Sequence, residues 1–201
     1  MCVQSLEESV PTRLPPRPGF EAIEAAAPET ASRRTLILAL IGNISFSWSN
    51  NESMFIYVLM LLLDIDQTSA AIIFSTLNTT RARLDLVQRL AAANIADKQV
   101  ASQLENLVER FNACTKIRNE FNHCMYALND LGEITHTHSM KISEVRGRLK
   151  FGAVRPVDDD RLKEMQGIIG DLKALNRDLW NFLPVLENHV ARKGEAVRQR
   201  G

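Results

Sequence analysis

Apolar residues recur with helical periodicity along most of the chain. Residues 35–63 contain no proline and one glycine, and on a helical wheel five of their large apolar side chains fall in one stripe. The stripe residues are Ile41, Trp48, Phe55, Leu59 and Leu63. Glu52 falls inside this stripe, where a carboxylate needs a cation or hydrogen-bond donors. The pattern predicts one long helix with a buried acid.

Two further helical segments follow. Residues 69–93 are predicted to be helical, with a break in the polar run 75–80 (STLNTT), whose side chains compete for backbone hydrogen bonds. Residues 97–128 give the clearest amphipathic pattern, with Asp97 as the N-cap and a turn signal at 129–132. The apolar face of this helix consists of Val100, Leu104, Leu107, Val108, Phe111, Cys114, Phe121 and Met125.

The pattern changes after the third helix. Residues 133–152 alternate β-branched and polar positions, which predicts two short strands, and residues 160–191 return to a helical pattern. The fold class is therefore an all-α bundle of four to five helices in up-down order, with a small β-hairpin before the last helix. We expect a disordered proline-rich tail over 1–30, one helical domain over 31–192 and a flexible basic tail over 193–201.

Composition and charge limit the classes of function. The 201 residues include 24 basic and 24 acidic side chains and are 45% hydrophobic, which argues against a disordered chain and against bulk attraction to nucleic acid or anionic membranes. Basic residues nevertheless gather in 141–155. This basic segment includes Lys141, Arg146, Arg148 and Lys150.

The compartment is expected to be the cytoplasm. The three cysteines are odd in number and include no CxxC pair, so a disulfide framework is not expected. The N-terminus has no apolar signal core, and the longest apolar run, Met54–Leu63, has ten residues, too few to span a bilayer. We expect no membrane association.

A polar constellation interrupts the apolar face of the third helix. Arg118 lies at the centre of that face and Asn122 lies close to it, while Thr115, Asn119 and His123 form a ridge on its flank. Polar groups placed there need partners. The acid inside the stripe of the first helix, Glu52, is the natural candidate to pair with Arg118.

This constellation resembles the signature of the HEPN superfamily, which is Arg, a polar residue, three further residues and His. Here the pattern reads RNEFNH, with Arg118, Asn119 and His123 in the signature positions. HEPN domains are helical bundles that carry the motif in a late core helix, and here it lies in the third long helix with one more to follow. The resemblance covers about 35–190 in its helical pattern, with 133–152 as an insertion.

The resemblance implies a metal-independent endoribonuclease of the toxin or defence type. In such an enzyme the 2′-hydroxyl of RNA attacks the adjacent phosphate, with His123 moving a proton and Arg118 stabilising the charged phosphorane. Asn119 would orient His123, with Glu52, Asn122 and Thr115 in support. The resemblance also implies a homodimer that joins two motifs, a cognate antitoxin or regulator as partner, and no cofactor. It implies RNA as substrate, with the RNA backbone held by Lys141, Arg146, Arg148 and Lys150.

Other interpretations remain open at the level of sequence. A structural pair between Arg118 and Glu52 would instead fit a non-catalytic helical interaction or scaffold module. His136 and His138 share one face of a predicted strand, a spacing that can hold a metal together with His123 and Cys124, but no third ligand has convincing local spacing, so no metal site is predicted. Cys124 and His123 are adjacent, so on a helix they point apart and do not form a catalytic pair.

Overall fold

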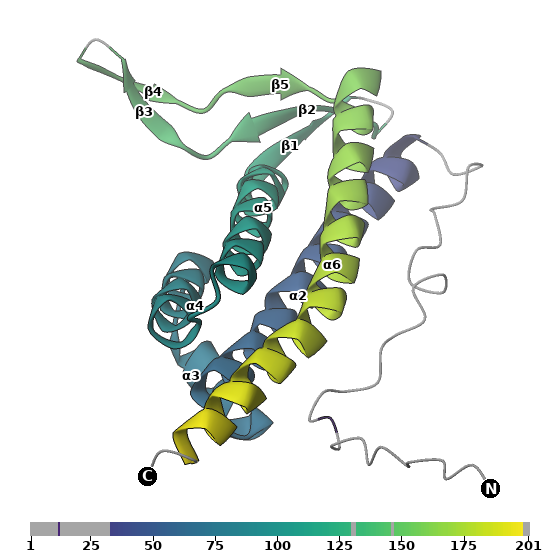
Figure 1. Ribbon diagram of the computed structural model, residues 1–201. Helices are drawn as coiled ribbons and strands as arrows, with labels where there is room; N and C mark the ends of the chain where they lie inside the picture. The colour runs from purple at the N-terminus through teal and green to yellow at the C-terminus, as the bar shows by residue number, and fades with distance from the viewer. Residues whose placement is uncertain (1–11, 13–32, 130–131, 146, 199–201) are drawn as a thin grey trace, which may run out of the picture.

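In the computed structural model, the described residues are 12, 33–129, 132–145 and 147–198. They contain five helices that alternate in direction along the chain (Figure 1). The helices are α2 (Arg33–Leu63), α3 (Gln67–Thr76), α4 (Thr80–Asn94), α5 (Lys98–Asn122) and α6 (Asp159–Arg198). The predicted all-α up-down bundle is confirmed.

The two longest helices, α2 and α6, pack against each other and run parallel (Figure 1). Their first residues are joined by an ion pair of 2.7 Å between Arg33 and Asp159. Further along, Asn51 is fully buried, and its amide donates to the Leu172 carbonyl of α6 at 2.9 Å and to the Ser47 carbonyl of its own helix at 2.9 Å. Buried polar groups need such partners, and these bonds fix the two helices in register.

α5 runs antiparallel to α2 and packs against it through aromatic rings. The Phe111 ring lies 5.5 Å from the Trp48 ring, stacked on it, and 5.3 Å from the Phe55 ring, measured between centroids. Phe111 and Phe55 are completely buried. Aromatic pairs at this separation add to the free energy of burial, so this cluster is the centre of the core between α2 and α5.

The helix breaks follow from capping. α3 ends at Thr76 and α4 begins at Thr80, where the Thr79 side chain accepts a hydrogen bond from the Ala82 N–H. The predicted break within 75–80 is therefore confirmed. The predicted N-cap at the start of α5 is confirmed as well, because the Asp97 carboxylate accepts from the N–H groups of Gln99 and Val100.

The apolar run in α2 lies inside the bundle. None of the ten residues of Met54–Leu63 is exposed. Among the described helices, none is both long and apolar enough to cross a membrane by itself, and only α2 and α3 taken together, as a pair bent by 118°, have the required length and composition.

A small β-structure connects α5 to α6 and projects from one end of the bundle (Figure 1). Strands β1, β2 and β5 form an antiparallel sheet in the order β1-β2-β5, and β3 pairs with β4 in a two-stranded ribbon. The bounds are β1 (Cys124–Leu128), β2 (Ile134–Ser139), β3 (Ile142–Val145), β4 (Arg148–Phe151) and β5 (Val154–Pro156). The predicted hairpin before the last helix is thus confirmed.

The predicted helix over 97–128 is wrong in its last part. α5 ends at Asn122, and the five residues after His123 form β1. Phe121 and Met125 fit helical spacing, but β2 offers every residue of β1 a partner in an antiparallel ladder. The Tyr126 hydroxyl also donates to the Phe121 carbonyl at 2.5 Å, which satisfies one of the open carbonyls at the helix end.

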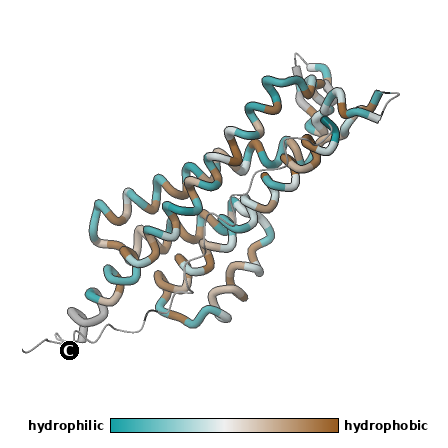
Figure 2. The backbone as a smooth tube through the Cα atoms, turned by 90° about the vertical axis from the view of Figure 1, so that its right-hand side faces the viewer, coloured by the Kyte–Doolittle hydropathy of each residue, from teal (hydrophilic) through white to brown (hydrophobic). Residues whose placement is uncertain are grey.

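The ribbon β3–β4 continues the sheet as a bent arm that extends past the helices (Figure 1). Figure 2 shows the helices lying along one another in an elongated bundle, with hydrophobic and hydrophilic residues alternating along them. At the bend, Gly152 has φ +62°, and a Cβ there would lie 2.3 Å from the Ser139 carbonyl oxygen. The position therefore requires glycine. Within the sheet, Met125 and Val154 are cross-strand neighbours of His138, and each is 57% exposed, so this face is open to solvent.

Cys114, on the buried face of α5, is expected to resist alkylation at pH 8. Burial, and then the charge of Asp171, raise the pKa of its thiol to about 11. The thiolate is the reactive form, and about one thiol in a thousand is ionised three units below its pKa. Peptide mapping after iodoacetamide treatment should show Cys124 modified well before Cys114, whose labelling should rise towards pH 11. Faster labelling of Cys114 at pH 8 would contradict its burial.

The predicted tails fall mostly outside the described residues. Of the segment 1–30, only Thr12 is described, and its hydroxyl donates to the Glu187 carboxylate of α6 at 2.9 Å. α6 extends to Arg198, through most of the segment 193–201 for which the sequence predicts a flexible tail.

Candidate functional site

Arg118 lies on α5 facing α2, half-buried, with its guanidinium over the Trp48 ring at 4.2 Å from the centroid. Its Nη1 donates to Asn119 Oδ1 at 3.0 Å. With the Asn122 amide oriented so that its oxygen faces the guanidinium, that oxygen accepts from Nε at 3.0 Å and from Nη2 at 3.2 Å. A guanidinium carries five N–H donors, so one N–H on each terminal nitrogen is left for a ligand.

The ring beneath Arg118 is itself held in place. Trp48 Nε1 donates to the Thr115 hydroxyl at 2.8 Å, and that hydroxyl donates to the Phe111 carbonyl at 2.8 Å. The resemblance implies that Thr115 supports the motif. In the structure this support is indirect. The hydroxyl of Thr115, itself oriented by the Phe111 carbonyl, fixes the indole of Trp48, and the indole lies under the guanidinium of Arg118.

The predicted pair between Glu52 and Arg118 is wrong. The Glu52 carboxylate pairs with Arg83 of α4 at 3.0 Å and accepts from the Thr80 hydroxyl at 2.7 Å. Glu52 lies on the same flank of α2 as Ser45, but about two turns further along, where α4 rather than the end of α5 lies opposite. Arg118 has no carboxylate within 4.0 Å among the described residues.

This lack of an acid distinguishes Arg118 from six other arginines of the structure. Each of these pairs with at least one carboxylate within 3.1 Å, and they are Arg33, Arg83, Arg89, Arg110, Arg155 and Arg161. Neutral amide oxygens and a ring face hold Arg118 without cancelling its charge. The site therefore presents a positioned, uncompensated cation, which suits an anionic ligand.

The two middle residues of RNEFNH, Glu120 and Phe121, connect the motif to β5 and α6. The Glu120 carboxylate accepts from Arg155 of β5 at 3.1 Å and from Arg161 of α6 at 3.0 Å. Arg161 is 5% exposed, also pairs with Glu164, and lies 4.3 Å from the centroid of the buried Phe121 ring. Burial lowers the pKa of Arg161 and its two acids raise it, with a net rise. This junction joins the end of α5 to the sheet and to the start of α6.

His123 stands at the boundary between α5 and β1. It is the C-cap of α5, its backbone N–H donates to the Asn119 carbonyl at 3.0 Å, and its side chain is exposed. Its imidazole has no hydrogen-bond partner in the part of the chain that the structure describes. The resemblance implies that the Asn119 side chain orients His123, but in this structure the Asn119 amide oxygen is engaged by Arg118 instead.

A polar cavity of about 510 Å³ adjoins the motif, between the start of α4 and the second half of α5. Asn119 lies in its wall and also contacts Arg118, so the cavity and the cation are neighbours. Two cations and no carboxylate line the cavity, whose wall consists of Thr79, Thr80, Arg81, Asn112, Thr115, Lys116 and Asn119. Neither Arg81 nor Lys116 forms an ion pair with any described residue.

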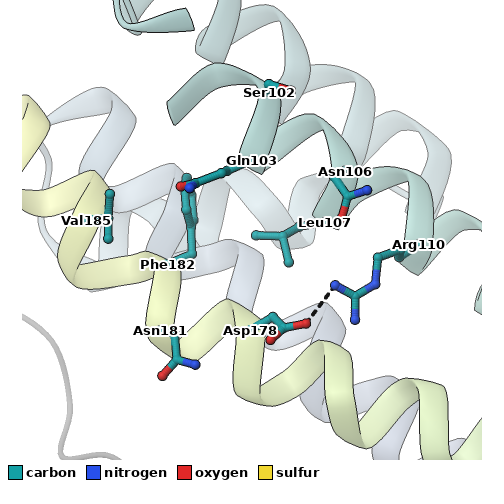
Figure 3. Close-up of a pocket in the computed structure, with 9 residues that line it drawn as sticks. All are labelled: Ser102, Gln103, Asn106, Leu107, Arg110, Asp178, Asn181, Phe182 and Val185. Atoms are coloured by element: carbon teal, nitrogen blue, oxygen red, sulfur yellow. Dashed lines mark hydrogen bonds and ion pairs between the residues drawn. The ribbon is translucent and has the colours of Figure 1, made fainter. Parts of the chain in front are cut away.

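A second cavity, of about 580 Å³, lies between α5 and α6 and has a different character (Figure 3). Its cation, Arg110, pairs with Asp178 at 2.7 Å, as the dashed line in Figure 3 marks. The rest of its wall contains carboxamides, such as Gln103 and Asn181, and apolar side chains, such as Phe182. This groove is electrically balanced, so the motif side of α5 is the better candidate for an anionic ligand.

Three of the four residues predicted to bind RNA lie on or beside the arm. Lys141 and Arg148 are exposed, Lys150 pairs with Ser143 in the ribbon ladder, and Arg146 lies outside the described residues. His136 and His138 lie on one face of β2, as predicted. Within the described ranges, no three histidine, cysteine or acidic side chains gather as metal ligands.

Trp48 and the cavity cations are site residues that the sequence did not predict. One signal for Trp48 is present in the sequence, because an indole N–H on a buried helix stripe needs an acceptor from a neighbouring element. Arg81 and Lys116 give no comparable signal, since each is an exposed charge on its own helix and they come together only when α4 packs on α5.

Comparison of the chain with protein-family models, with curated proteins and with solved structures found no match. The resemblance to the HEPN superfamily therefore rests on Arg118, Asn119 and His123 and on their helical setting.

Proposed function

We propose that the protein is a HEPN-like, metal-independent endoribonuclease that cleaves RNA at Arg118 and His123. One observation carries the proposal. The guanidinium of Arg118 is fixed in direction by Trp48, Asn119 and Asn122, yet it has no acid beside it among the described residues and retains two N–H groups on different nitrogens. Such a fork matches two oxygens of a phosphate.

The proposed reaction is the one that the resemblance implies. The 2′-oxygen of one nucleotide forms a bond to the adjacent phosphorus, and the bond from phosphorus to the 5′-oxygen of the next nucleotide breaks. His123 accepts the 2′-hydroxyl proton, and His123 of a second copy donates a proton to the leaving 5′-oxygen. Arg118 stabilises the negative charge that builds on the phosphorane. The products are a 2′,3′-cyclic phosphate and a 5′-hydroxyl.

We expect the arm and the adjoining strands to bind the part of the RNA that lies beyond the cleaved phosphate. Residues 134–156 contain five basic residues and one acidic residue, although the whole chain is neutral. The exposed Lys141 and Arg148 would contact phosphates beyond the cleaved one, a contribution that weakens as salt increases. The alternative of a non-catalytic interaction or scaffold module included a structural pair between Arg118 and Glu52, but Glu52 pairs with Arg83 instead.

His123→Ala is expected to lower RNA cleavage by about 10²- to 10⁴-fold, the usual contribution of general acid-base catalysis. The assay uses purified full-length protein, a labelled single-stranded RNA and excess EDTA, with mass spectrometry of the fragments for 2′,3′-cyclic phosphate ends. A substrate with a 2′-deoxy nucleotide at the cleaved position should be inert, because the attacking hydroxyl is missing.

His136→Ala is the matched control, because His136 is another exposed histidine, on β2. It should cleave at the wild-type rate. Equal cleavage by wild type and His123→Ala would sink the proposal, and so would a wild-type protein that leaves RNA intact; the second result would favour the interaction module.

A further inference from the structure

Two residues in the wall of the cavity between α4 and α5, Thr115 and Asn119, support Trp48 and Arg118, but the rest of the wall has no part in the proposed chemistry. Arg81 enters from the first turn of α4 and Lys116 from α5, and neither has an acidic partner among the described residues. The acid behind this wall, Glu52, is already paired with Arg83 and accepts from the Thr80 hydroxyl. The cavity therefore keeps two uncompensated positive charges.

Neutral donors accompany these charges. The Asn119 amide oxygen accepts a hydrogen bond from Arg118. The Asn119 NH₂ group has no acceptor among the described residues and can donate to a ligand. Asn112, one turn before Lys116, is exposed, and its amide makes no hydrogen bond within the described part of the chain. The start of α4 adds little, because Thr79 already caps it. The side chains thus provide two cations and two free amides, the set of groups that binds a phosphate.

From this arrangement we infer that the cavity is a phosphate subsite, which holds a phosphate of the RNA strand next to the one that is cleaved. The inference rests on the proposed function for its ligand. Asn119 connects the two positions, because it contacts Arg118 and also lines the cavity. In the proposed arrangement, a strand with one phosphate on Arg118 places the next phosphate along α5, towards Lys116 and Arg81.

The test measures RNA binding without cleavage. In the His123→Ala background of the full chain, Arg81→Gln combined with Lys116→Gln should weaken binding of a fluorescent single-stranded RNA roughly tenfold or more, the effect of removing a charge-assisted hydrogen bond. The slope of log affinity against log salt should fall in magnitude by about 0.7 for each phosphate that the protein no longer neutralises.

Arg89→Gln combined with Lys98→Gln is the matched control. Both residues are exposed, they lie on the same two helices, Arg89 pairs with Asp85, and neither lines the cavity. The control removes the same net charge. If it weakens RNA binding as much as the cavity pair does, the effect is general electrostatics and the subsite is overturned.

Inorganic phosphate distinguishes the source of the ligand. Shifts of the Asn112 and Asn119 side-chain amide signals on adding phosphate, relative to chloride of equal ionic strength, together with weaker RNA binding by the cavity pair, support the subsite. Weaker RNA binding alone supports it as well. Phosphate shifts without any effect on RNA binding overturn the assignment to RNA, and so does the lack of both effects.

The subsite and the proposed function fail in different ways. If the wild type does not cleave RNA but RNA and phosphate still bind through Arg81 and Lys116, the proposed function is lost and the subsite stands. If the wild type cleaves RNA and the cavity pair leaves affinity and KM unchanged, the proposed function stands and the subsite is lost.

Discussion

Arg118→Lys is expected to lower the rate of RNA cleavage by roughly 10²- to 10³-fold while the fold stays intact. Lysine keeps the positive charge but lacks the planar fork that two amides hold over the Trp48 ring. The interaction with the ring contributes about 0.5–1 kcal/mol, so the melting temperature should change by only a few degrees. The measurement is single-turnover cleavage, with circular dichroism as the check on folding.

Arg110→Lys provides the comparison. Arg110 lies two turns earlier on the same helix, half-buried, and pairs with Asp178 at 2.7 Å in the balanced groove. The same substitution there keeps the charge and should leave cleavage unchanged. Equal losses from the two variants, or no loss at Arg118, would show that the fork at Arg118 has no role in the reaction.

Phe111→Ala is expected to destabilise the protein by about 3–5 kcal/mol, the usual cost of removing a fully buried aromatic side chain. Its ring contacts both Trp48 and Phe55 and has no exposed surface, so its removal leaves a cavity between α2 and α5. Urea unfolding measures the change as a lower midpoint.

Phe46→Ala is the control for this loss. Phe46 is on α2 like two of the core aromatic residues, but it is 53% exposed. Its removal should change the free energy of unfolding by less than about 0.5 kcal/mol, as is usual for surface positions. A midpoint for Phe111→Ala that matches the one for Phe46→Ala would contradict the assignment of Phe111 to the core.

The helices could be predicted from the sequence because burial repeats with the period of the helix. The positions of the helix ends could be predicted from capping residues, namely Asp97 at the start of α5 and the polar run 75–80 before α4. The inward position of Arg118 also followed from its place on the helical wheel. A helical wheel shows in which direction a side chain points from the axis of its own helix, but it does not show which other element lies opposite that side chain.

That limit explains what the sequence did not predict. Glu52 and Arg118 both face inward, which favours a pair between them, but the parallel packing of α4 beside α2 places Arg83 against Glu52. Phe121 and Met125 keep helical spacing, which favours a helix over β1, while its strand state depends on pairing with β2. The cavity residues Arg81 and Lys116 depend in the same way on packing between separate helices.

The change from helix to strand at His123 gives the two signature side chains different anchors. Arg118 is fixed to α2 through Trp48, whereas the chain after His123 belongs to the sheet and its arm. The strand that begins the sheet thus starts directly after the imidazole, while the guanidinium is held by the bundle, and the pair between Glu120 and Arg155 of β5 joins the two parts. In the proposed enzyme, an RNA that contacted Arg118 and also Lys141 and Arg148 would therefore span the connection between the bundle and the sheet.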